Sequence, residues 1–239
     1  MSVFMSAFAG LVEHLADLLQ PLFHASAAAA AIVLFTALVR LLVHPLSRAA
    51  ARGQRARAAL QPRIAELREQ HGKNQEALQK AVLELHAAEK VSPLSGCLPG
   101  MLQLPAFFVL YHLFSSSTIG GHGNGLLSHA LLGAPLGGRW SDVLADGGFG
   151  SGGGLVYLVL FALVAAVATF NFRRARRTTA TPVAGAADQQ VPGVGAVTKV
   201  MPYLSYATLV TVAVVPLAAA LYVVTSTTWS AVERAVLYR

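Results

Sequence analysis

The sequence predicts an all-α, polytopic membrane protein with a water-exposed helical hairpin between two of its membrane spans. Hydrophobic residues make up 55% of the 239 residues and charged residues 12%, about half the charged fraction of a typical soluble domain. Several apolar runs have the length that crosses a bilayer. Basic residues cluster beside these runs, between Arg48 and Lys90 and again at 173–177. Because such clusters stay on the cytosolic side, they also predict the orientation of the spans.

Residues 1–22 are predicted to form an amphipathic helix in the extracytosolic interface of the membrane. Apolar residues recur there at three- and four-residue spacing: Phe4, Phe8, Leu11, Leu15 and Leu18. Glu13, Asp17 and Gln20 lie on another face and interrupt the apolar core that a signal peptide would need. Pro21 is expected to end this helix. A frayed terminus is the alternative interpretation.

The first predicted span is 23–44, and it contains a permanent charge at Arg40. An arginine at the centre of a membrane helix costs roughly 2.5 to 3.5 kcal/mol. Arg40 lies about five residues, or roughly 7 Å along a helix, from Pro45, which is close enough for its side chain to reach the membrane surface. The segment alone therefore leaves two interpretations open, a functional intramembrane charge and a snorkelling anchor.

Residues 45–92 are predicted to form a cytosolic helical hairpin. Two apolar stripes at helical spacing are expected to pack together: Leu60, Ile64 and Leu67 in the first arm, and Leu78, Val82 and Leu85 in the second. The break at His71 and Gly72 separates the arms. Pro62 is expected to kink the first arm or to mark its restart.

The second predicted span, 96–114, is bent by two prolines and carries the polar Gln103 at membrane depth. In lipid such a residue faces neighbouring helices or a wet cavity. A glycine-rich extracytosolic loop, 115–154, follows this span, and a short helix is expected within it at Leu126–Gly133.

The second half of the chain is divided by its charges and by one proline. Its predicted segments are spans at 155–172, 200–215 and 216–233 and a cytosolic loop at 173–199. As one helix, the last apolar stretch would be about 50 Å long, against roughly 30 Å of hydrocarbon, and Pro216 divides it. One span would also strand Arg234 outside, whereas two spans return it to the cytosol. The sequence therefore predicts five spans, with the N-terminus outside and the C-terminus in the cytosol.

Four stretches carry recognisable motifs in a fixed order. They are VRLLVHPLSRAAARGQ at Val39–Gln54, LQPRIAELREQHG at Leu60–Gly72, SPLSGCLPGMLQLPAFFVLYHLF at Ser92–Phe114, and MPYLS followed by PLAAALYVVTSTTWS in the last hairpin. In order, spacing and orientation they resemble the YidC-type membrane-protein insertases, which are related to the mitochondrial oxidase-assembly insertases. The resemblance runs from about Leu34 to Arg234.

The resemblance implies a fold and a site. It implies five spans that enclose a hydrophilic groove, open to the cytosol and to lipid. It also implies that Arg40, Thr36 one helical turn earlier, Gln103 and Tyr222 line this groove, and it therefore favours the functional interpretation of Arg40. After Tyr222 the family has a second aromatic residue where this chain has Val223, which argues against a stacking role at that position.

The function implied by the resemblance is the insertion and chaperoning of other integral membrane proteins in the plasma membrane. The expected partners are nascent membrane proteins, the lipid bilayer, the Sec translocon and the ribosome, but not DNA. Because the sequence has no nucleotide-binding motif, catalytic constellation or metal-ligand spacing, neither an enzyme activity nor a cofactor is expected. The alternative is a small-solute transporter or channel subunit, a class that usually carries several ionisable groups inside its spans.

Overall fold

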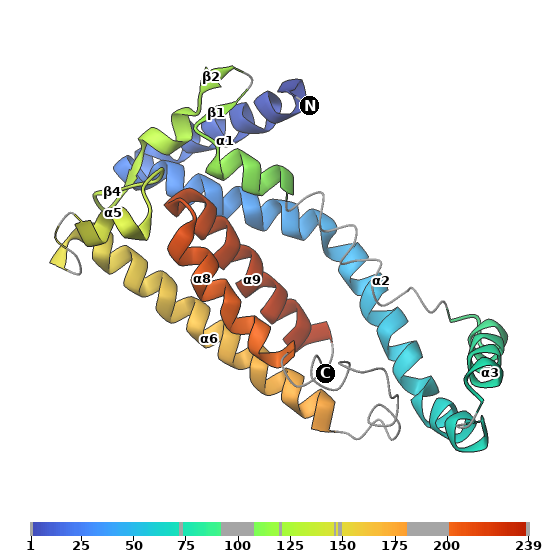
Figure 1. Cartoon of the computed structure of the whole chain (residues 1–239). Coiled ribbons are helices and arrows are strands. Elements are labelled where there is room, and N and C mark those ends of the chain that lie inside the picture. The colour runs from blue at the N-terminus through green and yellow to red at the C-terminus, as the bar shows by residue number, and fades with distance from the viewer. Residues whose placement is uncertain are drawn as a thin grey trace.

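The computed structural model describes residues 2–71, 74–91, 108–119, 121–145, 147, 150–180 and 201–237. The described chain is mostly helical, as the sequence predicts. Its long helices are α1 (Ser2–Phe23), α2 (Ala27–His71), α6 (Gly152–Ala180) and α9 (Leu217–Leu237). Figure 1 shows α6, α9 and the shorter α8 side by side, with α1 across one end of this bundle and α2 extending well beyond the other.

α2 is a single helix that contains both Pro45 and Pro62. The turn η1 (His24–Ser26) separates it from α1, so the helix begins at Ala27 rather than at the predicted boundary, residue 23. Alanine, leucine and arginine dominate the sequence around both prolines, and these strong helix formers carry the helix through them. The predicted first span and the first arm of the predicted hairpin are therefore parts of one helix.

The hairpin is completed by α3 (Gln75–Ala88), which returns along the end of α2. Asn74 caps α3, because its side-chain oxygen accepts a hydrogen bond from the Ala77 amide at 3.1 Å. An ion pair between Arg63 and Glu89 joins the two helices. Ile64, from the predicted stripe of α2, is buried.

Residues 116–145, which we call the cap, cover the end of the bundle next to α1. They hold two small antiparallel hairpins, β1 (Thr118–Ile119) with β2 (His122–Gly123) and β3 (Ala130–Leu131) with β4 (Ala134–Pro135). They also contain the turn η2 (Gly125–Ser128) and the short helix α5 (Trp140–Ala145).

The prediction of a short helix at residues 126–133 is wrong. Only η2 is helical, and the chain then enters β3 and turns back into β4. Leu132 and Gly133 make this turn with positive φ angles of 50° and 85°, which a right-handed helix excludes. The buried Asn124 fixes the cap to the helical residues 108–115, since its Nδ2 donates to the carbonyl oxygen of Leu113 at 2.8 Å.

The last two helices meet at Pro216. The 3-10 helix η4 (Met201–Tyr206) leads into α8 (Ala207–Val214), and α9 begins directly after the proline. The first turn of α9 is bound to the cap, because the Leu217 and Ala218 amides donate to the carbonyl oxygens of Gly138 and Leu136, both at 2.9 Å. These bonds satisfy amides that a helix leaves unpaired at its start.

The hydrophobic core lies where α1, the cap, the helical residues 108–115 and the parts of α2, α6, α8 and α9 next to the cap meet. Val12 and Ala16 of α1 are buried there, next to the small residues that begin α2. α1 continues past Pro21, although the sequence predicts that this proline ends it. Leu11 and Leu18, expected on the same stripe as the packed Phe8 and Leu15, are 55% and 74% exposed. α1 thus presents a second apolar surface outward.

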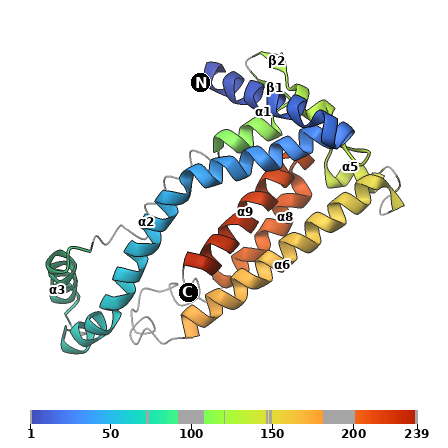
Figure 2. The ribbon, with the colours of Figure 1, turned by 180° about the vertical axis from the view of Figure 1, so that it is seen from behind.

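Two helical stretches of the described chain are long and apolar enough to cross a membrane, one within Ala7–His71 and one within Gly152–Arg176. Tyr203–Val214 is a shorter apolar helix. Figure 2 shows from behind that α6, α8 and α9 stay together along their length, while α2 diverges from them toward α3. The number of spans and the direction of the termini stay predictions.

Candidate functional site

Three polar contacts join α2 to α9, in the same order along both helices. Arg40 contacts Ser226, His44 contacts Glu233, and Arg55 donates to the carbonyl oxygen of Leu237. We call this line of contacts the α2–α9 seam. The seam starts below the hydrophobic core, where the residues of α9 change from wholly buried aliphatic ones to a serine- and threonine-rich stretch.

Arg40 makes the first contact of the seam, at the end next to the hydrophobic core. Its Nε donates to the Ser226 hydroxyl at 3.1 Å, and its Nη2 donates to the same oxygen. Ser226 is only 6% exposed, whereas Arg40 is half-buried. Tyr222, Glu233 and Arg234 also interact electrostatically with the Arg40 guanidinium. The structure therefore holds the cation by side chains of α9 and does not extend it away from the protein.

Tyr222, one helical turn before Ser226, lies at the inner end of the seam. Its side chain is 1% exposed, and its ring packs against Phe114 with ring centroids 5.9 Å apart. Arg40 interacts electrostatically with its hydroxyl. The structure thus brings together Arg40 and Tyr222, two of the residues predicted to line a groove.

Of the other two residues predicted to line the groove, the structure describes Thr36 but not Gln103. Thr36 is 1% exposed, and its hydroxyl donates to the carbonyl oxygen of Ile32 at 2.7 Å, which is a bond within its own helix. Thr36 therefore lies one helical turn from Arg40, and its hydroxyl proton is already donated to the backbone of its own helix. Gln103 lies outside the described residues, and its place in the site stays a prediction.

His44 and Glu233 form the second contact of the seam. The His44 Nδ1 lies 2.5 Å from Oε1 of Glu233, and the two side chains are 33% and 11% exposed. Glu233 is the only acidic residue of α9, and α2 carries none before Glu66. The sequence motifs point to neither Glu233 nor Ser226. Their signal was the spacing of Tyr222, Ser226, Ser230 and Glu233 on one helical face.

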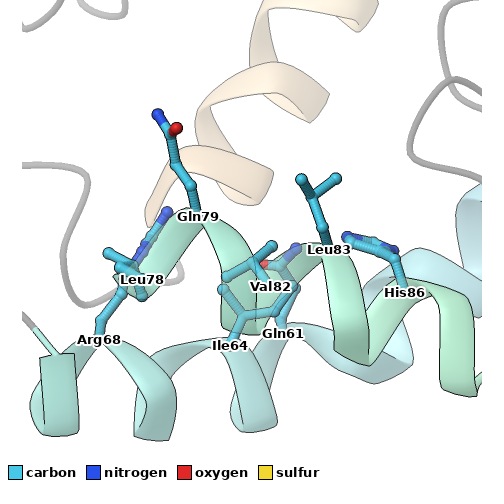
Figure 3. A pocket seen from close by; sticks show the side chains of 8 residues that line it. All are labelled: Gln61, Ile64, Arg68, Leu78, Gln79, Val82, Leu83 and His86. Carbon is cyan, nitrogen blue, oxygen red and sulfur yellow. The ribbon is translucent and has the colours of Figure 1, made fainter. Parts of the chain in front are cut away.

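A separate pocket of about 410 Å³ lies in the hairpin, between α2 and α3. Figure 3 shows Gln61 and Ile64 of α2 opposite Val82 of α3, while Arg68 reaches across toward Leu78. The Arg68 Nη1 is buried and has no hydrogen-bond partner among the residues that the structure describes. In the described part of the chain, no group of three or more His, Cys, Asp or Glu side chains could hold a metal ion.

Comparison with known families decides the relationship of the chain. The family model described as 60Kd inner membrane protein matches residues 19–239, which include both helices of the seam. The chain belongs to this family. The resemblance to YidC-type insertases that the sequence motifs indicate is therefore confirmed.

Curated relatives of the chain carry the name membrane protein insertase YidC. The chain is 39% identical over 87 residues to the protein of Methylobacillus flagellatus, and this match covers 36% of the chain and 16% of that relative. It is 46% identical over 81 residues to the protein of Laribacter hongkongensis, covering 34% and 15%. It is 44% identical over 87 residues to that of Francisella tularensis subsp. novicida, covering 36% and 16%. The matched part is thus about a sixth of each relative's length.

The departure from the family motif at Val223 has a structural context. Val223 is 4% exposed and belongs to the hydrophobic core, in a run of buried residues that reaches from Leu217 to Val224. A valine there contributes packing to the end of the seam next to the cap. Tyr222 is the aromatic residue of this pair of positions that lies beside Arg40.

Proposed function

We propose that the chain is a membrane protein insertase and chaperone, which inserts and helps to fold integral membrane proteins through a hydrophilic groove open to the cytosol. The observation that carries the proposal is the half-buried Arg40. It belongs to α2, a helix that is apolar enough to cross a membrane, and its guanidinium donates to Ser226 of α9. Keeping a permanent charge in such a helix is costly unless it has a use. The name of the relatives, membrane protein insertase, supports the same activity.

In the proposed mechanism, Arg40 attracts the polar and often acidic end of an incoming chain. The attraction is stronger beside the low-dielectric protein than in bulk water. Ser226 offers a hydroxyl on which the guanidinium rests, and a substrate carboxylate would compete for the same donors. The apolar segment of the substrate then moves into lipid, and burial of its surface supplies roughly 25 cal/mol per Å².

The shortness of η4 and α8 would lower the energy barrier that the polar end of the substrate meets when it crosses the hydrocarbon. η4 and α8 together have six 3-10 and eight α-helical residues. At about 2.0 and 1.5 Å per residue they extend about 24 Å, against roughly 30 Å of hydrocarbon. Lipid next to these helices would have to thin, which shortens the path that a polar segment crosses.

The remaining parts of the proposal follow the sequence prediction. We place five spans in the plasma membrane, around a groove lined by Arg40, Thr36, Gln103 and Tyr222, with the N-terminus outside and the C-terminus in the cytosol. The proposed partners are nascent membrane proteins and lipid, with the Sec translocon and the ribosome as docking partners. The drive is lipid burial, so the chain needs neither ATP nor catalytic residues of its own. No observation favours the alternative, a small-solute transporter or channel.

Reconstitution tests this function directly. The purified protein in liposomes should insert a single-span membrane protein without ATP or a membrane potential, and empty liposomes should insert far less. A photoreactive group at position 40 should crosslink to a stalled substrate, whereas one at the exposed Leu158 of α6 should crosslink to lipid. Equal insertion with and without the protein would refute the proposal. Reporters at residue 130 outside, and at 80, 185 and 239 in the cytosol, would test the topology.

A further inference from the structure

Glu233 has an unusual place for an acidic residue. In sequence, α6 and α8 carry no acidic residue, α9 carries only this one, and α2 carries none before Glu66. Its side chain is 11% exposed and is bound by His44 rather than by a lysine or arginine. A carboxylate this deeply buried needs a partner, because removing a charge from water is costly. A histidine, which is charged only when protonated, is the weakest cation that could serve.

Arg40 and Glu233 lie in a fixed order along the helices of the seam, and Arg55 follows them on the hairpin side. His44 follows Arg40 by one helical turn, about 6 Å, and Glu233 follows Ser226 by seven residues, about 10 Å. α2 and α9 both run away from the cap in this region, toward the end of the bundle from which α2 continues to the hairpin (Figure 1). The cation is therefore nearer the cap, and the carboxylate is nearer the hairpin.

This order matches the charges of a membrane segment in its usual orientation. Such segments keep lysine and arginine residues on the cytosolic flank. Arg40 and Glu233 lie too close together for the two ends of one span, which are roughly 30 Å apart, to occupy both at once. After the acidic end has left Arg40 and crossed the membrane, the basic flank of the segment comes to lie on the hairpin side of Arg40, where Glu233 lies. The geometry points to Glu233 as a second substrate subsite, which binds a lysine or arginine side chain on the retained flank and so selects the orientation of insertion. The inference rests on the proposed insertase function.

Partner exchange at Glu233 is consistent with the contacts. The His44 side chain is one-third exposed, so water can reach it when it leaves the carboxylate. A lysine ammonium or arginine guanidinium carries a full charge and forms a stronger, charge-assisted hydrogen bond. His44 thus holds the subsite between substrates, and the carboxylate stays paired in both states.

A substrate series with a varied retained flank tests the subsite. The substrates are single-span proteins with one constant acidic translocated end and zero, two or four lysines on the other flank. They are assayed in liposomes without a membrane potential, with the wild-type protein, Glu233→Gln and Glu66→Gln. The glutamine at position 233 keeps an oxygen for His44 but loses the charge. Glu66 of α2 is exposed and lies outside the seam, so Glu66→Gln is the matched control.

The wild-type protein should insert the four-lysine substrate at least about fivefold better than the lysine-free one, the factor that the Coulomb energy of about 1 kcal/mol at 4 Å in water gives as a lower limit. Glu233→Gln should abolish this preference, and Glu66→Gln should keep it. Glu233→Lys should reverse it, so that the lysine-free substrate is inserted best. A Glu233→Gln protein that retains the lysine preference, or that loses insertion of all substrates equally, would overturn the subsite while leaving the insertase function. Failure of the wild-type protein to insert any substrate would refute both.

Discussion

The charge of Arg40 is the feature whose removal should change insertion most directly. Arg40 is half-buried, so a substrate carboxylate beside it would lie between bulk water and the protein interior. At about 4 Å, Coulomb's law gives about 1 kcal/mol in water and about 4 kcal/mol at an effective dielectric constant of 20. Because 1.36 kcal/mol is a tenfold change, each engaged carboxylate should raise insertion by about fivefold at the lower limit.

The assay compares substrates that carry zero, one or two aspartates at the translocated end, inserted by wild-type, Arg40→Lys and Arg40→Ala proteins in liposomes. Lysine keeps the charge but cannot make the two donations to the Ser226 hydroxyl, so it should keep most of the aspartate dependence at a lower overall rate. Alanine should remove the dependence.

An Arg40→Ala protein that inserts all three substrates as the wild-type protein does would refute the reasoning, because a snorkelling anchor predicts that result. Thermal unfolding of each variant in detergent is the control for loss of fold. The comparison between substrates within one variant is insensitive to the amount of folded protein, so the aspartate dependence can be read even when a variant is less stable.

Three further predictions concern packing. Tyr222→Ala should lower the free energy of unfolding by about 3 to 5 kcal/mol, since the ring is wholly buried, whereas Tyr222→Phe should change it by less than about 1.5 kcal/mol; unfolding in detergent measures both. Gly152→Ala should be strongly destabilising, because a Cβ there would lie 2.3 Å from a carbonyl oxygen of the cap. Gly10→Ala, with no atom within 4 Å of the new Cβ, is its control, and an equal melting temperature for the two would contradict the packing. Val82→Ala should enlarge the pocket of the hairpin and speed amide hydrogen exchange throughout α3. Glu84→Ala, at an exposed position of α3 that does not line the pocket, should not; equal exchange rates in the two variants would mean that α3 is not held by this contact.

The sequence predicted helices well where the signal was local. α2 ends at His71 and α8 ends at Val214, next to the two breaks that the sequence predicts. Val215 has an extended backbone, because a proline disfavours the helical conformation of the residue before it. Pro45 misled the prediction of a boundary, since a proline removes one hydrogen bond and long runs of helix-forming residues on both sides outweigh that loss. The turn between β3 and β4 requires a positive φ at Leu132, and no sequence motif predicts such an angle at a leucine.

The site was predictable only in part, because its contacts join distant segments. Arg40 stood out as a charge in an apolar run, and Tyr222 was reached through the family motif. Glu233 contacts His44 across 189 positions, and Ser226 contacts Arg40 across 186. Their position on one face of α9 is a local signal, but it does not tell which helix they contact. Only the parallel packing of α2 and α9 brings Ser226 to Arg40 and Glu233 to His44.

The uninterrupted course of α2 gives the protein a lever arm. From Pro45 to His71 the helix extends 26 residues, or about 39 Å, beyond the stretch that carries Arg40. A tilt of about 10° around the seam would swing the far end through about 7 Å, since a helix transmits rotation along its whole rise. Binding of a substrate at Arg40 would thereby move α3, and a partner bound to the hairpin would be displaced with it. Because the helix is stiff, a force on the hairpin would in turn act on the contact between Arg40 and Ser226.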